Sequence, residues 1–154
     1  MSATKRQRLA RVLWVVSAVL MLIRVVDITN TRKIVNILDN YHRVDRIVIS
    51  RGKAETVISG DELGRYKEAF EPGVILSGHR KAINKVLGDK YLEMRFFIED
   101  KILFRSVVYE LQEGDEAPGC FEMGNRKYMM KVGWDYRSLN ETSKEFLLEA
   151  VPRG

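Results

Sequence analysis

The chain has 154 residues, of which 45% are hydrophobic and 31% charged, a composition typical of one folded domain and not of a disordered or collagen-like chain. Its net charge is +5, but residues 1–31 hold five basic side chains and one acidic one, so the other 123 residues are close to neutral. The sequence therefore predicts no nucleic-acid partner for the domain. Cys120 is the only cysteine, which excludes an internal disulfide and a cysteine-rich metal site.

The N-terminus carries the pattern of a membrane-targeting segment. Four basic side chains lie within residues 5–11, and Val12–Ile23 then runs for twelve residues without a charge. A basic region followed by an apolar one is typical of a secretory signal, and we predict contact with a membrane through Val12–Ile23. Three interpretations remain open: an uncleaved signal anchor, a cleaved signal peptide, and a helix buried in the fold or in an interface.

Length favours the anchor. Twelve helical residues span only about 18 Å, which is less than the roughly 30 Å of a bilayer core. The twenty residues of Leu9–Ile28 are long enough if Arg11 and Arg24 extend towards the two membrane surfaces. A helix that is apolar on all sides either crosses a membrane or is deeply buried, and a domain of this size could hardly enclose it.

The flanking residues favour the same interpretation. Signal cleavage prefers small residues after the apolar run, whereas Ile23 is followed by Arg, Val, Val and Asp. Basic residues before a span keep the N-terminus in the cytoplasm. We therefore predict a leader over residues 1–30 and a single extracytoplasmic domain over residues 31–154.

The first half of the domain alternates helical and strand patterns. Residues 31–42 have apolar positions at helical spacing, which predicts an amphipathic helix or an extension of the hydrophobic one. Residues 44–50 and 55–58 read as a β-hairpin. Ser59 and Glu62 have the spacing of a capping box, which predicts a helix ending before Pro72. Two further elements are expected between residues 73 and 89: a short strand at 74–76, and a helix over 82–87 stopped by Gly88.

The second half is rich in strands. Residues 91–98 and 101–111 alternate in polarity around a short connection, which predicts an antiparallel hairpin. Residues 121–123 and 126–132 form another hairpin around Gly124-Asn125, in which Met129 is the one apolar residue on an otherwise polar face. A helix over 143–151 closes the chain. Its predicted cap is the pair Thr142 and Glu145.

These elements predict an α+β fold. An antiparallel sheet of about five or six strands would carry two or three helices and follow an N-terminal hydrophobic helix, with the helices near 60–70 and 143–151 covering one face. On the hairpin of residues 91–111, called the strong hairpin below, Arg95 and Arg105 are expected to pair with Glu93 and Glu110 across strands.

The sequence holds no recognisable catalytic pattern. Phosphate loops, nucleophile elbows and zinc-protease motifs are all missing, and His42 and His79 stand in no ligand or catalytic spacing. Asp61 and Glu62 fit a helix start better than acid–base chemistry. Glu113, Asp115 and Glu116 share a polar loop but lack the register of a calcium-binding loop. We therefore predict no catalytic, metal-binding or cofactor-binding residues, and no cofactor.

The candidate contact residues are Trp134, Tyr136 and Arg137. They follow the last strong strand and set two aromatic rings beside a guanidinium, a combination that is frequent where proteins bind ligands or partners. The same residues would equally serve as the edge of the core, because aromatic rings usually supply packing area.

Two segments carry a resemblance. VDRIVISRGKAETVISGDELGRY and the strand-rich YLEMRFFIEDKILFRSVVYEL resemble small bacterial secreted or membrane-anchored proteins of unknown function. The resemblance covers about residues 44–151 and implies a hairpin, a helix, further strands and a closing helix. It implies no site. Residues 71–90 are an insertion relative to that pattern, and the chain lacks its lipid-attachment cysteine.

The sequence thus favours a membrane-anchored extracytoplasmic domain that is a non-enzymatic binding or interaction module for an unknown protein or small ligand. Two alternatives stay open. One is a small enzyme with an unmarked carboxylate site, which would need a pocket of paired acids with shifted pKa values. The other is a cytoplasmic protein whose N-terminal helix is a dimer interface.

Overall fold

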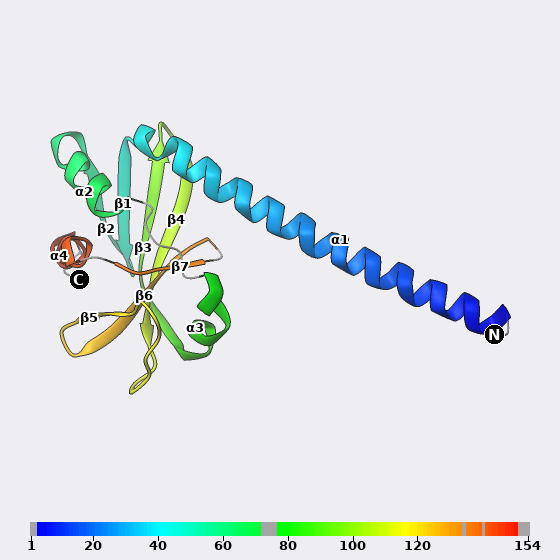
Figure 1. The fold of residues 1–154 in the computed structure, drawn as a ribbon. Coiled ribbons are helices and arrows are strands. Elements are labelled where there is room, and N and C mark those ends of the chain that lie inside the picture. Colours follow the sequence, from blue (N-terminus) through cyan, green and yellow to red (C-terminus); the bar gives the residue numbers. More distant parts are fainter. Residues whose placement is uncertain (1–2, 72–76, 134, 140, 151–154) are drawn as a thin grey trace. The chain divides into compact units, whose positions relative to one another are not determined.

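The computed structural model describes residues 3–71, 77–133, 135–139 and 141–150 of the chain. The chain divides into two compact units, residues 1–36 and residues 37–154. The prediction of a boundary at residue 30 stays a prediction. Figure 1 labels the helices and strands along the chain.

The N-terminal helix α1 runs from Ala3 to Asn40 and is followed by a 3₁₀ turn, η1, at Tyr41–Arg43. No glycine or proline occurs within α1, so nothing in its backbone interrupts it. The helix expected over residues 31–42 is therefore an extension of the hydrophobic helix. The apolar side chains between Val12 and Ile28 of α1 are exposed, up to 80% for Trp14. By length and composition it is the one described helix able to cross a membrane.

Among the described residues, seven strands form one sheet, with every pairing antiparallel. The strands are β1 Arg46–Arg51, β2 Ala54–Ser59, β3 Leu87–Ile98, β4 Lys101–Leu111, β5 Phe121–Met123, β6 Arg126–Val132 and β7 Asp135–Arg137. Their order is β2-β1-β3-β4-β6-β5, and β7 also pairs with β6. The short strands β5 and β7 share one edge of β6, since β5 pairs with residues 126–128 and β7 with residues 130–132.

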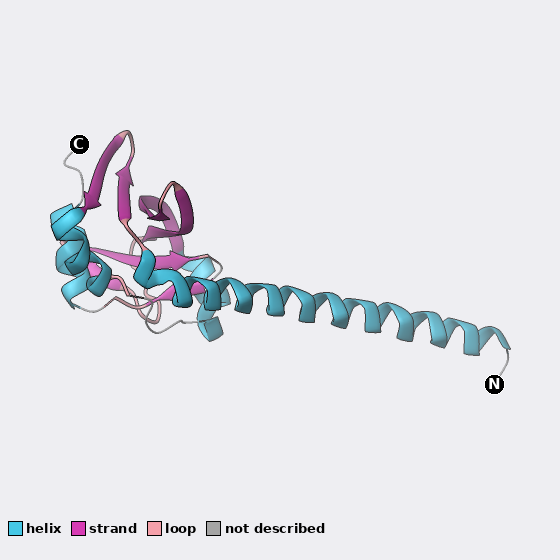
Figure 2. Cartoon of the chain, turned by 90° about the horizontal axis from the view of Figure 1, so that it is seen from above, coloured by secondary structure: helices cyan, strands magenta, loops and turns pink. Residues whose placement is uncertain are grey.

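In the described part of the chain, three helices after α1 accompany the sheet. Figure 2 draws helices in cyan and strands in magenta. The three helices are α2 Leu63–Ala69, α3 Arg80–Val86 and α4 Glu141–Ala150. Two 3₁₀ turns precede the first two of them: η2 at Gly60–Glu62 and η3 at Ser77–His79.

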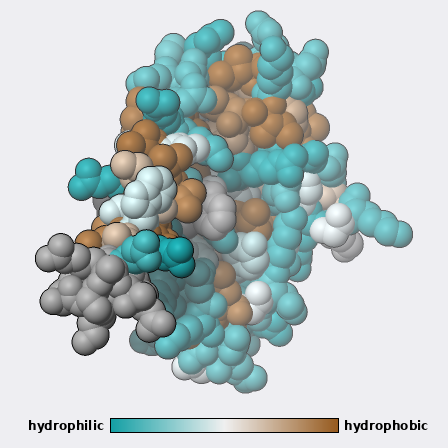
Figure 3. Space-filling view, turned by 90° about the vertical axis from the view of Figure 1, so that its right-hand side faces the viewer, coloured by the Kyte–Doolittle hydropathy of each residue, from teal (hydrophilic) through white to brown (hydrophobic). Residues whose placement is uncertain are grey.

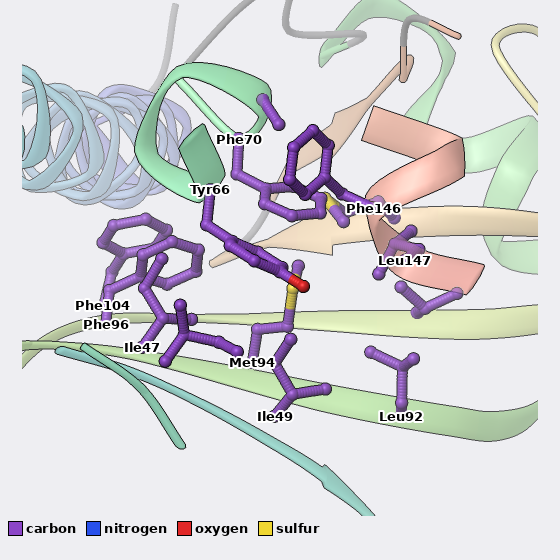
Figure 4. Packing of buried hydrophobic residues seen from close by; sticks show 14 of the residues in the cluster. Ile47, Ile49, Tyr66, Phe70, Leu92, Met94, Phe96, Phe104, Phe146 and Leu147 are labelled. Atoms are coloured by element: carbon purple, nitrogen blue, oxygen red, sulfur yellow. The ribbon is translucent and has the colours of Figure 1, made fainter. Parts of the chain in front are cut away.

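The main core lies between one face of the sheet and helices α2 and α4. Figure 4 shows Tyr66 of α2, Phe70 directly after α2 and Phe146 of α4 facing strand residues that include Met94 and Phe96. The Tyr66 and Phe146 rings meet edge to face at 4.7 Å between centroids. Alternate residues of each strand point to this face, so the alternation in the sequence supplies the core. The expected covering of one face by these two helices is confirmed.

The opposite face of the sheet has a smaller core under α3. Ile83 of α3 is buried with Leu111 of β4, Met129 of β6 and Tyr136 of β7. Met129 and Met130 are neighbours in one strand and therefore point to opposite faces. The apolar residue that broke the polar face of β6 is thus explained, because α3 covers that part of the face.

Several predicted local signals act differently in the structure. Ser59 makes no capping hydrogen bond, because Gly60 turns the chain at a φ of +63° and the first turn is a 3₁₀ turn. Helix α4 begins at Glu141, so Thr142 lies inside the helix and is not its cap. Gly88 does not stop a helix but lies in β3, where an added Cβ would come within 3.0 Å of the Glu110 carbonyl oxygen. The short strand expected at residues 74–76 falls outside the described residues.

The fold class is confirmed as α+β: a long apolar N-terminal helix, an antiparallel sheet of six strands with β7 added at its edge, and three further helices. The predicted hairpins at 44–58, 91–111 and 121–132 are all present. What the sequence did not indicate is that helices cover both faces of the sheet.

Candidate functional site

The predicted contact residues occupy β7 and the position before it. Trp134 falls outside the described residues. Tyr136 is completely buried in the smaller core, and its hydroxyl donates a hydrogen bond to Asn84 Oδ1 of α3. Arg137 is only 5% exposed, on the side of the main core. Both side chains therefore hold β7 against neighbouring helices: Tyr136 binds α3, and Arg137 binds the end of α2. Neither side chain offers a free surface to a partner.

Arg137 binds the end of α2. Its guanidinium donates hydrogen bonds to the carbonyl oxygen of Phe70, at 3.3 Å, and to that of Glu71. The last carbonyl groups of a helix have no partner within it and carry a partial negative charge, so a cation there is favourable. Among the described residues no carboxylate forms an ion pair with Arg137. The end of α2 therefore takes the place of a counter-ion.

Two other side chains bind the same end of α2. The Tyr41 hydroxyl donates to the Lys67 carbonyl oxygen at 2.9 Å, and the Ser143 hydroxyl donates to the Ala69 carbonyl oxygen. Lys67 in turn donates from Nζ to the carbonyl oxygens of His42, at 2.5 Å, and Val44, at 3.0 Å. The C-terminal end of α2 thus joins η1, β7 and α4. We call the side chains Tyr41, Lys67, Arg137 and Ser143 the α2 clamp.

Burial shapes the electrostatics of the α2 clamp. It raises the pKa of Tyr41 well above its usual value, since the ring packs against Phe96 and Phe104 and the phenolate would lose its hydration. It also lowers the pKa of the Arg137 guanidinium, an effect opposed by Tyr41 and Glu71 nearby. The clamp therefore includes a neutral phenol, that of Tyr41, and a buried cation, that of Arg137.

An open hollow of about 350 Å³ lies beside the clamp, lined by Leu38, Tyr41, His42, Lys67, Glu68 and Glu71. It combines one imidazole, two carboxylates and an apolar wall. Lys67 is already engaged by backbone carbonyl groups, so Glu68, Glu71 and His42 are the groups with polar capacity to spare for a ligand. Such an open, mixed surface fits a side chain of a protein partner better than an enclosed small molecule.

A second hollow of about 430 Å³ lies over the polar loop, between residues 110–115 and residues 125–127. Glu113 and Asp115 line it, but Glu116 instead pairs with Lys127. Arg126 forms an ion pair with Glu110, with 2.6 Å between Nη1 and Oε1. Among the residues that the structure describes, no group of three His, Cys, Asp or Glu could hold a metal ion.

The predicted cross-strand pairs of the strong hairpin are wrong in their partners. Arg95 pairs with Glu55 of β2 and also binds the Ser50 hydroxyl, Glu93 pairs with Lys90, and Glu110 pairs with Arg126. The reason is register: Arg95 lies directly opposite Arg105, so no carboxylate faces it across this pair of strands, and it binds Glu55 of β2 instead.

The shifted carboxylates do not have the shift that an acid catalyst needs. Lys90 lowers the pKa of Glu93 through a hydrogen bond, and Lys127 does the same for Glu116. A general acid working near neutral pH requires a raised pKa. Asp61 and Glu62 lie in η2 before α2, where acids are ordinary features of a helix start.

Comparison with known proteins yields no relative. No family model, no curated protein and no solved structure matches the chain. The functional argument therefore rests on the residues alone.

Sequence reasoning found Arg137 and Tyr136 but not their neighbours. Tyr41 and Ser143 were read only as members of helices, and Lys67 was not singled out. Their meeting point depends on where β7 and α4 bring Arg137 and Ser143, whose contacts with the end of α2 join residues 67 and 74 positions apart. One local signal was present in the sequence. Phe70 and Glu71 follow α2 in place of a capping glycine, so the last carbonyl groups of α2 need other partners.

Proposed function

We propose that the chain is a membrane-anchored extracytoplasmic domain that works as a non-enzymatic binding or interaction module. The observation that supports this most is the state of α1. An 18-residue window within Ala10–Arg43, which covers most of α1 and all of η1, has a mean hydropathy of 2.2, and none of that window is buried. Exposing that many Val, Leu and Ile side chains to water is unfavourable by about 25 cal/mol per Å², and a bilayer removes this cost.

Charge supports the orientation. The basic residues before Val12 stay on the cytoplasmic side of a bilayer, which sends residues 37–154 across it. A lone, half-buried Cys120 is compatible with an oxidising compartment. A cleaved signal would leave the same domain outside the cytoplasm without its anchor.

The hollow beside the α2 clamp is the binding surface that we propose for the module. The contact predicted for Arg137 then takes an indirect form, since Arg137 holds the Glu71 carbonyl group at the rim of that hollow. Figure 3 shows one side of the molecule, on which hydrophobic patches are separated by hydrophilic surface. Apolar surface divided in this way by polar side chains is typical of protein contacts.

Membrane fractionation of the full-length protein tests the proposal, with protease added to intact cells. We expect the chain in the membrane fraction and its domain digested from outside. Leu20 lies near the middle of the twenty-residue stretch Leu9–Ile28, so Leu20→Arg should cost about 3 kcal/mol of insertion and release the protein. The matched variant Leu20→Ala should stay in the membrane.

Other outcomes would contradict parts of the proposal. A full-length protein that is soluble without detergent and protected from protease would favour the cytoplasmic alternative, in which α1 is a dimer interface. A membrane-bound chain that is protected from protease in intact cells would reverse the orientation only. A shortened, soluble and extracytoplasmic chain would mean that the leader is cleaved.

A further inference from the structure

The apolar surface of α1 continues beyond the length that a bilayer can cover. If Leu9–Ile28 spans the membrane and Asp27 and Ile28 lie at its outer surface, Val35 lies seven residues beyond Ile28 along the helix, roughly 10 Å further out. Val35 is nevertheless 47% exposed and Leu38 is 48% exposed. Lipid does not cover these two side chains, whereas a second protein surface on the same side of the helix would. Leu38 also lines the edge of the hollow beside the α2 clamp.

The spacing of this surface is that of a coiled-coil seam. Ile28 and Val35 are seven residues apart, as are Thr31 and Leu38, and the two pairs interleave at three and four residues. In heptad terms Ile28 and Val35 take position a, and Thr31 and Leu38 take position d. β-branched residues at a with Leu at d favour two parallel strands. Ile37 falls at position c, off the seam, and packs instead against the main core.

Thr31 fits a buried position despite its hydroxyl group. Its Oγ1 donates to the Asp27 carbonyl oxygen one turn earlier, at 2.9 Å. The hydroxyl is therefore satisfied within the helix, and the methyl group is left to face a partner. Burial of Thr31 would leave no donor without an acceptor.

The charges beside the seam are complementary to those of a second copy. Asp27 takes position g and Arg32 takes position e of the next heptad, which are the two positions that meet across a parallel dimer. Both residues are exposed, and among the described residues neither forms an ion pair within its own chain. Two-fold symmetry makes each such pair occur twice.

Arg24 sets the lower limit of the contact. It would occupy the preceding d position, where two guanidinium groups would face each other. The seam therefore begins at Asp27, with Arg24 extending to the lipid surface. Two heptads are too short to dimerise strongly in free solution, but confinement to a membrane raises the effective concentration of the partner.

We propose that residues 27–38 of α1 form a parallel two-stranded coiled coil with a second copy of this chain, just outside the membrane. This rests on the proposed function in two ways. The position of the membrane span leaves Val35 outside the lipid, and the membrane concentrates the chains. The dimer would carry two copies of the domain on one stalk.

Disulfide crosslinking in intact membranes tests the proposal, using full-length protein with Cys120→Ser as background. Thr31→Cys and Val35→Cys lie on the seam, whereas Lys33→Cys lies on the opposite side of the same helix and is exposed. A mild oxidant should give covalent dimers several-fold more abundant at positions 31 and 35 than at 33. Equal crosslinking at all three positions in membrane-bound protein would overturn the dimer alone.

Charge reversal tests register and direction. In the Thr31→Cys background, Asp27→Arg should lower the yield of crosslinked dimer, because it faces Arg32 of the second copy. Combining Asp27→Arg with Arg32→Asp should restore it, and failure to restore would overturn the parallel pairing. The same samples are fractionated: protein released from the membrane would overturn the anchor, whereas retained protein without position-specific crosslinks leaves the anchor standing.

Discussion

The two units of this chain use the same kinds of side chain in opposite ways. Leu20 in α1 is 57% exposed, whereas Leu92 in β3 is 1% exposed. In unit 37–154 strand alternation sends half of the apolar residues to a face that helices cover. In α1 the apolar residues surround the helix, so no single protein face could cover all of them. The comparison teaches that hydrophobicity alone does not place a residue in a core. The spacing of the apolar residues along an element decides whether a protein face can cover them or whether they require lipid.

The largest effect is expected from a matched pair of truncations. Leu92→Ala should destabilise unit 37–154 by about 2–5 kcal/mol, because it removes packed atoms and leaves a cavity in the main core. Leu20→Ala should leave the same unfolding transition unchanged. The measurement is denaturant unfolding of the full-length protein in detergent. Equal destabilisation by both variants would mean that α1 is part of the folded core and would break the comparison.

A smaller effect is expected at the α2 clamp. Arg137→Met should cost about 2 kcal/mol, since the Phe70 and Glu71 carbonyl groups lose their donors while the apolar bulk is kept. Arg105→Met is the matched control, because Arg105 is exposed, and its cost should stay within about 0.5 kcal/mol. The same unfolding assay compares the two. Similar costs would mean that the buried guanidinium adds nothing beyond its bulk.

The smallest effect is expected at Tyr41, and it depends on pH. Tyr41→Phe should cost about 1 kcal/mol at pH 7 through the lost hydrogen bond to Lys67. The folded protein holds the pKa of Tyr41 above its unfolded value of about 10. The unfolded chain therefore loses this proton first as pH rises, and stability falls above about pH 10.

Replacing Tyr41 with Phe removes that contribution. The loss of stability above pH 10 should be less steep in Tyr41→Phe than in the unmodified protein. Unfolding free energies at several pH values between neutral and strongly alkaline solution measure the slope. Identical slopes would show that the Tyr41 phenol is as hydrated in the folded state as in the unfolded one.

The elements were predictable where the signal was local. The hairpins formed by β3 with β4 and by β5 with β6 follow directly from alternation and from turn residues at Gly124-Asn125. The capping box at Ser59 failed because the pattern Ser-x-x-Glu carries no information on the backbone angles of Gly60 between its members. The partners of Arg95 failed because a two-strand argument cannot show that β2 lies on the far side of β1 and reaches Arg95 with Glu55.

The candidate site was predictable only in part. Arg137 stood out in the sequence as a charge beside aromatic rings, yet its role depends on α2, nearly 70 residues earlier in the chain. The hollow beside the clamp requires η1 and α2 to lie together, which no periodicity encodes.

The sequence by itself determined the apolar N-terminal helix, the α+β class, and the residues of each strand that face the core, because these depend on the order of neighbouring side chains. Tertiary structure alone decided that α3 covers a second face, that Met129 and Tyr136 belong to a separate core, and that three side chains from distant elements bind the end of α2. The reason is physical: a backbone carbonyl group or a buried ring accepts any suitable neighbour, and only the folded chain selects which one arrives.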